Sequence, residues 1–313
     1  MYQHLFGPVP SRRLGMSLGI DLVPHKVCTF NCIYCECGRT TRLTVQRDAY
    51  VPVEEVFAEL EHYLAHYPRP DFLTLSGAGE PTLNSHLGEV LSFIRHRAPS
   101  SRTAVITNGS LLSDPQVRAE LSTADVVMPS LDAASERTFR CMDRPSPRIR
   151  LATLLTGLAA FREVFPGEIW LEVVILPGYN DNVEDLRLLR EALVRIRPDR
   201  IQLNTLDRPG TETGLQPASH EQLLRIATAW GLEHVSVIAS APPEGAGEAF
   251  REDPRSTILG TVARRPCTLE DLARTLGAPQ EEIARELAAL EREGRLIANA
   301  QPRGTFYRLA ADD

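Results

Sequence analysis

The sequence predicts an α/β fold, in which a mostly parallel sheet is covered by helices, followed by a small α-rich domain. From about residue 16 to 240, short runs rich in Val, Ile and Leu alternate with longer amphipathic stretches. Such alternation requires right-handed crossovers between parallel strands. Six strand–helix units fit either a partial (β/α)6 TIM-like barrel or a doubly wound sheet. In both architectures, functional groups collect at the carboxyl ends of the strands.

Each predicted strand is bounded by Gly, Pro, Asn or Asp, and each predicted helix repeats its apolar residues at spacings of three and four. The strands are expected at 17–22, 71–77, 103–108, 125–131, 169–175 and 200–206, with a weaker seventh at 234–239. The helices between them are expected at 53–67, 87–97, 149–165, 183–196 and 220–231.

The periodic pattern stops at ASAPPEGAGEAFRED (239–253), which is rich in Ala, Gly and Pro. We therefore divide the chain into a core domain at 1–240, a linker at 241–253 and a second domain at 254–313. Three helices are expected after the linker, at 256–265, 268–277 and 280–294, and a hairpin at 295–310. Three helices and a hairpin predict a winged-helix domain.

The composition is that of an ordinary globular protein, with 43% hydrophobic and 24% charged residues among 313. No apolar run suits a signal peptide or a membrane span, so we expect a cytoplasmic protein without membrane contact. The net charge of −7 argues against broad non-specific binding to nucleic acid. Clustered cysteines in a cytoplasmic protein are more often metal-binding or catalytic than disulfide-bonded.

Three of the six cysteines lie within the stretch CTFNCIYC, at Cys28, Cys32 and Cys35. Structural zinc requires four ligands, and Cys37 could be the fourth. A thioredoxin-like dithiol would leave Cys28 unexplained. A cubane [4Fe–4S] cluster normally has four thiolate ligands, so three would leave one iron open to another ligand. These three interpretations remain open at this point.

The spacing Cys-x3-Cys-x2-Cys, with Tyr34 before the last cysteine, resembles the signature of radical S-adenosylmethionine (SAM) enzymes. The stretches SGAGEP (76–81), TNG (107–109), SLDA (130–133), LEVVILPGYND (171–181) and QLN (202–204) follow in that family's order. More narrowly, the chain resembles an uncharacterised iron–sulfur oxidoreductase group that is distantly similar to the wybutosine-synthesis radical SAM enzymes. Members of that group often carry a C-terminal winged helix.

The resemblance implies roles for particular residues. Cys28, Cys32 and Cys35 would bind the [4Fe–4S] cluster, and Cys37 would lie outside the ligand set. A second set would contact S-adenosyl-L-methionine, with the Glu80 carboxylate pairing with its amino group. That set is Tyr34, Gly77, Gly79, Glu80, Asn108, Ser130, Asp132 and Glu172. For Glu172, pairing with a buried arginine is the alternative, because an acid inside an apolar strand needs a partner. Lys26, the sole lysine, could pair with an anion.

The resemblance also implies an activity. The enzyme would cleave SAM reductively to give a 5′-deoxyadenosyl radical, with an electron donor such as ferredoxin or flavodoxin. Its substrate would be a tRNA base, a peptide or a protein. The alternative is an iron–sulfur or metal-sensing regulator that reads nucleic acid through its winged helix. Against it, the third C-terminal helix carries Glu281, Glu282, Glu286, Glu291 and Glu293, which would repel phosphates.

Overall fold

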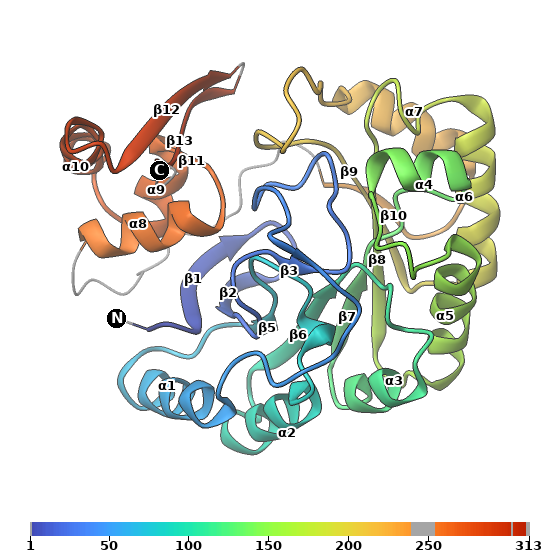
Figure 1. Ribbon diagram of the computed structural model, residues 1–313, viewed down its shortest axis with the longest axis horizontal. Helices are drawn as coiled ribbons and strands as arrows, with labels where there is room; N and C mark the ends of the chain where they lie inside the picture. The colour runs from blue at the N-terminus through green and yellow to red at the C-terminus, as the bar shows by residue number, and fades with distance from the viewer. Residues whose placement is uncertain (1, 239–253, 302, 311–313) are drawn as a thin grey trace.

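The computed structural model describes residues 2–238, 254–301 and 303–310. Its main sheet has eight strands in the order β1-β2-β5-β6-β7-β8-β9-β10 (Figure 1). The first pair is antiparallel, and every other neighbouring pair is parallel. The strands are β1 (Leu5–Ser11), β2 (Gly15–Ile20), β5 (Phe72–Leu75), β6 (Arg102–Thr107), β7 (Val126–Pro129), β8 (Glu168–Val174), β9 (Arg200–Asn204) and β10 (Val235–Val237). This is a mixed α/β fold with a central parallel sheet, as the alternating pattern predicts.

Helices connect the parallel strands and lie along the outside of the sheet in Figure 1. They are α1 (Val53–His66), α2 (Leu87–Arg97), α3 (Pro115–Leu121), α4 (Glu136–Met142), α5 (Leu151–Val164), α6 (Val183–Ile196) and α7 (His220–Trp230), with a short 3-10 turn η1 (Pro81–Leu83). Helix α6 shows the pattern that made these helices predictable. Its buried Leu189, Ala192, Leu193 and Ile196 recur at spacings of three and four and so form one apolar face.

The buried core lies between the sheet and these helices. Apolar side chains from the strands pack there against the inner faces of the helices, and many are fully buried, among them Leu18, Leu73 and Phe161. Burial of this extent rigidifies the strands. The polar residues that follow them are therefore held at fixed positions along one edge of the sheet.

The C-terminal residues form a separate small unit with its own core of buried apolar residues. It contains α8 (Pro254–Arg264), α9 (Leu269–Leu276) and α10 (Gln280–Arg292), and a three-stranded sheet in the order β11-β13-β12. The strands are β11 (Cys267–Thr268), β12 (Leu296–Gln301) and β13 (Gly304–Leu309). The three expected helices and the hairpin are thus present, and the linker at 241–253 lies outside the described residues.

Two parts of the core escaped the sequence prediction. Strand β1 reads LFGPVPS and contains two prolines, which are unusual within a strand. It lies at the edge of the sheet and pairs only with β2, so missing N–H groups are tolerated there. Helices α3 and α4 have seven residues each, which is too short for a periodic pattern to be recognised. No helix among the described residues is long and apolar enough to cross a membrane.

Candidate active site

The cysteine-rich loop begins at β3 (Val27–Cys28) and returns to the parallel strand β4 (Arg42–Leu43). Its backbone is tied to the end of α4. The Ile33 N–H donates to the Met142 carbonyl at 2.9 Å, and the Asn31 N–H to the Asp143 carbonyl at 3.1 Å. Phe30 and Ile33 are buried beneath it. The loop is therefore fixed over the carboxyl ends of the strands.

A cavity of about 220 Å³ lies between this loop and the strand ends. It brings together the three predicted cluster ligands and all but one of the predicted SAM-binding residues. Its lining includes Cys28, Cys32, Tyr34, Cys35, Gly77, Gly79, Glu80, Asn108, Ser130 and Asp132. Among the lining residues outside the predicted set, Lys26, Cys37 and Asp143 carry ionisable side chains. Residues as far apart in the chain as Lys26 and Leu154 thus converge on one cavity.

The thiols of the loop differ in their electrostatic surroundings. Burial raises the pKa of Cys28 to about 11 and that of Cys32 well above its usual value. Cys35 is the exception, because a hydrogen bond from Cys37 and the charge of Lys26 lower its pKa to about 5. A low pKa provides the thiolate that metal binding requires. Cys35 is therefore the thiol of this loop whose surroundings most favour ionisation.

Lys26 is the nearest cation to these thiols. It has a left-handed backbone with φ of 58° and its side chain is 3% exposed. Its Nζ donates to the Cys35 Sγ at 2.9 Å. Burial opposes the charge, but Cys35, together with Cys28 when that thiol is ionised, raises the pKa of Lys26. The ammonium therefore stays charged beside the cluster loop.

The segment after β5 brings backbone and a carboxylate to the cavity. Gly77 has φ of 137°, a conformation that favours glycine. A Cβ on Gly79 would lie 2.4 Å from the Val27 carbonyl, so only glycine fits beneath the loop. Glu80 is 2% exposed, and burial raises its pKa, while hydrogen bonds from Thr107 and Thr82 oppose this rise. Both glycines allow close approach of the backbone to a ligand.

The Glu80 carboxylate is held in one orientation by protein donors. Oε1 accepts from the Thr82 N–H at 3.1 Å and from the hydroxyls of Thr82 and Thr107, each at 2.6 Å. Among the residues that the structure describes, Oε2 accepts only from the Asn108 N–H, at 2.8 Å. A carboxylate oxygen can accept about two hydrogen bonds. Oε2 therefore keeps capacity to accept from a ligand ammonium, whereas Oε1 is saturated.

Asn108 and Ser130 lie at the ends of β6 and β7. The Asn108 Nδ2 donates to the Thr29 Oγ1 at 2.7 Å and lies 3.6 Å from the Cys28 Sγ. The Ser130 N–H donates to the Thr107 carbonyl at 3.0 Å. Both side chains thus border the cavity, and Asn108 is in addition a hydrogen-bond donor to a predicted cluster ligand.

Tyr34 and two buried carboxyls form a network on the far wall. The Tyr34 hydroxyl is hydrogen-bonded to Asp132 Oδ2, and its oxygen lies 2.9 Å from Asp143 Oδ1, so its one proton serves one carboxyl group at a time. Burial raises the pKa of Asp132 to about 7, and burial together with the nearby Asp132 raises the pKa of Asp143 further. The Cys32 thiol lies 3.9 Å from Asp143 Oδ1. Tyr34 therefore connects the cysteine loop to the end of β7.

Glu172 does not line this cavity. It lies on β8, where it forms an ion pair with Arg13 and accepts a hydrogen bond from Asn204 Nδ2 at 3.0 Å. Burial opposes ionisation, but the Arg13 guanidinium lowers the pKa of Glu172. The pairing with an arginine, one of the two interpretations of this residue, is present. The predicted contact of Glu172 with SAM stays a prediction.

Two residues that the sequence did not assign to the site are placed in it. Asp143 follows α4 in the stretch CMDRP, where nothing in the local pattern marks it as functional. Cys37 lies with its Sγ 3.8 Å from the Gly77 carbonyl and borders the cavity. In the sequence, only the position of Cys37 two residues after Cys35 indicated that it could belong to the site.

The donor set fits an iron–sulfur cluster. Cys28, Cys32 and Cys35 are free thiols facing one cavity, and N–H groups of Lys26 and Asn108 point at two of their sulfurs. Thiolates with such hydrogen bonds hold [4Fe–4S] clusters. Among the described residues, no three His, Cys, Asp or Glu side chains are placed to hold one metal ion. The thiolates of a cubane each bind a different iron and therefore surround the cluster instead of converging on one point.

Comparison with known families decides the classification. The family model of the radical SAM superfamily matches residues 22–189, which contain the cysteine loop and the strand ends up to β8. The chain belongs to the radical SAM superfamily. It is therefore an enzyme, and its cofactors are a [4Fe–4S] cluster and S-adenosyl-L-methionine.

Relatives by sequence cover most of the chain. It is 30% identical over 309 residues to a UPF0026 protein of Methanocaldococcus jannaschii, covering 96% of this chain and 94% of that protein. It is 32% identical to a UPF0026 protein of Helicobacter pylori, covering 85% and 86%. A protein of Brachyspira hyodysenteriae named GTPase Obg is 33% identical over 94% of this chain, but the chain spans only 43% of that relative.

Solved structures show the same fold at low sequence identity. A radical SAM methyltransferase from Sphaerobacter thermophilus superposes with a TM-score of 0.54 at 18% identity, covering 71% of this chain and 65% of that one. Streptococcus suis SuiB, bound to S-adenosylmethionine, gives a TM-score of 0.51 at 14% identity, covering 70% and 50%. These similarities place the core within the radical SAM fold.

Proposed function

We propose that Cys28, Cys32 and Cys35 hold the [4Fe–4S] cluster and that the adjoining strand ends hold SAM at its open iron. The observation that carries the proposal is the shared cavity of about 220 Å³, which the three thiols and the strand-end residues line together. When bound, the cluster and SAM supply reductive C–S cleavage, which gives methionine and a 5′-deoxyadenosyl radical. That radical would abstract a hydrogen atom from the substrate.

The protein residues have separable tasks in this scheme. Glu80 Oε2 accepts from the SAM ammonium, because Oε1 is already saturated. Gly77 and Gly79 allow the backbone to approach the ligand. Asn108 and Ser130, at neighbouring strand ends, bind its hydroxyl or carboxylate groups. Tyr34 and Asp132 form the opposite wall and exclude water.

We assign residues 1–240 to a partial (β/α)6 TIM-like barrel core and 254–313 to a winged-helix domain, joined by a linker at 241–253. The seven consecutive strands with a common parallel direction support the first assignment. Three helices followed by a small antiparallel sheet support the second. Membership of the radical SAM superfamily does not favour the alternative hypothesis, in which the protein is a regulator that binds nucleic acid through its winged helix.

The reaction needs an electron donor, and we infer a ferredoxin or flavodoxin in the cytoplasm. Within the superfamily, the chain is proposed to belong to the iron–sulfur oxidoreductase group distantly similar to wybutosine-synthesis enzymes. A tRNA base, a peptide or a protein remains the proposed range of substrates. Weaker relatives named GTP 3′,8-cyclase, one from Pseudomonas aeruginosa at 32% identity over 53% of the chain, add nucleotides to this range.

Anaerobic reconstitution with iron and sulfide, followed by dithionite and SAM, tests the proposal. We expect iron–sulfur absorption and formation of 5′-deoxyadenosine, measured by liquid chromatography and mass spectrometry. The matched control is Cys37→Ala, which should retain both the iron and the cleavage. Full iron content with no 5′-deoxyadenosine would contradict the proposed activity, and loss of iron in Cys37→Ala would contradict the ligand assignment.

A further inference from the structure

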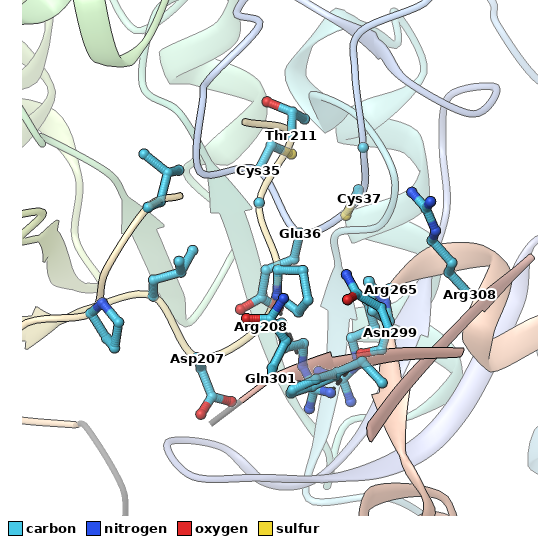
Figure 2. A pocket seen from close by; sticks show the side chains of 18 of the residues that line it. Cys35, Glu36, Cys37, Asp207, Arg208, Thr211, Arg265, Asn299, Gln301 and Arg308 are labelled. Carbon is cyan, nitrogen blue, oxygen red and sulfur yellow. Dashed lines mark hydrogen bonds and ion pairs between the residues drawn. The ribbon is translucent and has the colours of Figure 1, made fainter. Parts of the chain in front are cut away.

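A second, larger cavity of about 880 Å³ adjoins the cluster loop on its other side. It shares Cys35 and Cys37 with the smaller cavity. One wall is the stretch 204–220 after β9, and the other is the C-terminal unit, from which Asn299, Gln301 and Arg308 are contributed (Figure 2). A molecule bound here would therefore lie next to the loop that holds the cluster.

Ion pairs hold the C-terminal wall against the core. Arg208 Nη1 lies 2.6 Å from Asp271 Oδ2, and both side chains are less than 10% exposed. Arg264 Nε lies 3.0 Å from Asp21 Oδ2. Arg303 bridges the two parts, with Asp271 at 2.5 Å and Asp207 at 2.8 Å. The cavity is thus a built feature of the fold, closed by both units together.

Arginine dominates the charge of the lining, and most of these arginines are already neutralised. The five that pair with carboxylates are Arg12, Arg39, Arg208, Arg264 and Arg303. Arg265 and Arg308 also line the cavity, and neither has a carboxylate within 4 Å among residues 2–238, 254–301 and 303–310. Glu36, whose carboxylate also interacts with the charge of Arg265, is already paired with Arg208. The lining therefore keeps a surplus of positive charge.

Two amide side chains accompany these guanidiniums. Asn299 and Gln301 project from β12, and neither side chain hydrogen-bonds to a described residue of the protein. Amides both donate and accept, so they complement uncharged polar groups of a ligand. Figure 2 shows Arg265, Asn299 and Arg308 on the wall that faces the loop of Cys35 and Cys37.

We propose that this cavity binds the substrate, and that the substrate carries a phosphate group held by Arg265 and Arg308. A phosphate monoester has a charge of about −1.5 to −2 at neutral pH, which two guanidiniums match, whereas one would suffice for a carboxylate. Arginine also binds phosphate oxygens in a bidentate manner. The volume lies in the range of about 300–1,000 Å³ that small-molecule sites occupy. The inference rests on the proposed function, because it places the substrate beside the cluster loop.

The test measures binding to the reconstituted full-length enzyme by isothermal titration calorimetry. The probes are inorganic phosphate, uridine 5′-monophosphate, uridine and a single-stranded oligouridylate. We expect the phosphate-bearing probes to bind and uridine to bind more weakly. Arg265→Gln combined with Arg308→Gln should weaken phosphate binding by about tenfold or more, the usual effect of losing charged hydrogen bonds. Tighter binding of the oligomer would identify RNA as the source of the phosphate, and tighter binding of the mononucleotide a free metabolite.

The matched control is Arg285→Gln, which removes an exposed arginine on α10 outside the cavity and should leave all affinities unchanged. Equal binding of uridine and its phosphate, unchanged phosphate affinity in the double variant, or binding of an acidic peptide in preference to phosphate would each overturn the proposal. SAM cleavage without substrate, assayed in the same variants, separates the two hypotheses. Its absence from the wild-type enzyme would count against the proposed function, whereas its presence there together with unchanged phosphate affinity in the double variant would count against the phosphate site alone.

Discussion

The two cavities on either side of the cysteine loop are built differently. In the smaller one, all four charged side chains of the lining, Lys26, Glu80, Asp132 and Asp143, have a hydrogen-bond partner in the protein. In the larger one, Arg265 and Arg308 have no carboxylate partner in the described part of the chain. The difference is that the protein itself holds the polar groups of the smaller cavity in place, whereas the larger cavity keeps guanidinium groups that a ligand can bind.

The largest effect should come from the cysteines of the smaller cavity. Cys28→Ala, Cys32→Ala and Cys35→Ala should each abolish SAM cleavage, because a cubane that loses one of three protein ligands is not retained. Iron content and 5′-deoxyadenosine are the measurements. Cleavage that survives in any of the three variants would show that the cluster is held by other residues.

The ion pairs that close the larger cavity should contribute to stability. Arg208→Met removes the partner of Asp271 across the interface, where both side chains are less than 10% exposed, and also the partner of Glu36 in the core. Breaking a buried pair costs about 3–5 kcal/mol, and we expect about 2–3 kcal/mol because Arg303 remains beside Asp271. Urea unfolding of the apoprotein, followed by circular dichroism, measures the loss.

The control for this interface is Arg225→Met, which removes an exposed ion pair with Glu221 on α7. Exposed pairs contribute at most about 1 kcal/mol, so this variant should unfold close to the wild type. An equal loss in both variants would mean that the Arg208 pair does not hold the C-terminal unit in place.

A substitution of Lys26 tests whether this residue raises the reduction potential of the proposed cluster. Lys26→Gln removes the ammonium that donates to the Cys35 Sγ at 2.9 Å. Positive charge and hydrogen bonds to sulfur stabilise the reduced, more negative cluster, so the variant should have a lower reduction potential. A redox titration followed by electron paramagnetic resonance measures it. Lys26→Arg keeps the charge and should shift the potential less, whereas equal potentials in wild type and Lys26→Gln would refute this role.

The smallest effect should be a change in the pH dependence of stability when Asp132, the hydrogen-bond partner of Tyr34, is replaced. Burial raises the pKa of Asp132 to about 7 in the folded protein, above its value in the unfolded chain. The folded state therefore binds more protons between about pH 4 and 7, and this group's contribution to stability falls as the pH rises through that window. Asp132→Asn should make the stability of the apoprotein decline less over the window. Thermal unfolding at several pH values measures this stability. If it depended on pH in the same way in wild type and variant, Asp132 would not make the proposed contribution.

The sequence predicted those features that depend on local pattern. Helix α6 was recognisable because the apolar spacing of Leu189, Ala192, Leu193 and Ile196 follows from its burial on one face. Cys28, Cys32 and Cys35 could be selected because they lie in one short motif, CTFNCIYC. Glu80 could be selected because its motif, SGAGEP, directly follows a predicted strand. Strand β1 was missed, since an edge position tolerates the prolines that normally argue against a strand.

The larger cavity was out of reach of the sequence because it depends on contacts between distant segments. Arg208 meets Asp271 across 63 positions, and Arg264 meets Asp21 across 243. No spacing rule connects such residues. The pairing of Glu172 with Arg13 was foreseen only as one of two alternatives, because an acid in a strand requires some partner without specifying which.

Mössbauer spectroscopy of the ⁵⁷Fe-reconstituted enzyme, with and without SAM, tests the central claim most directly. If three cysteines hold the cluster and SAM binds the remaining iron, one iron of the four should change its signal when SAM is added. Four irons that remain unchanged on addition of SAM would contradict the account, because the cluster would then have no open iron.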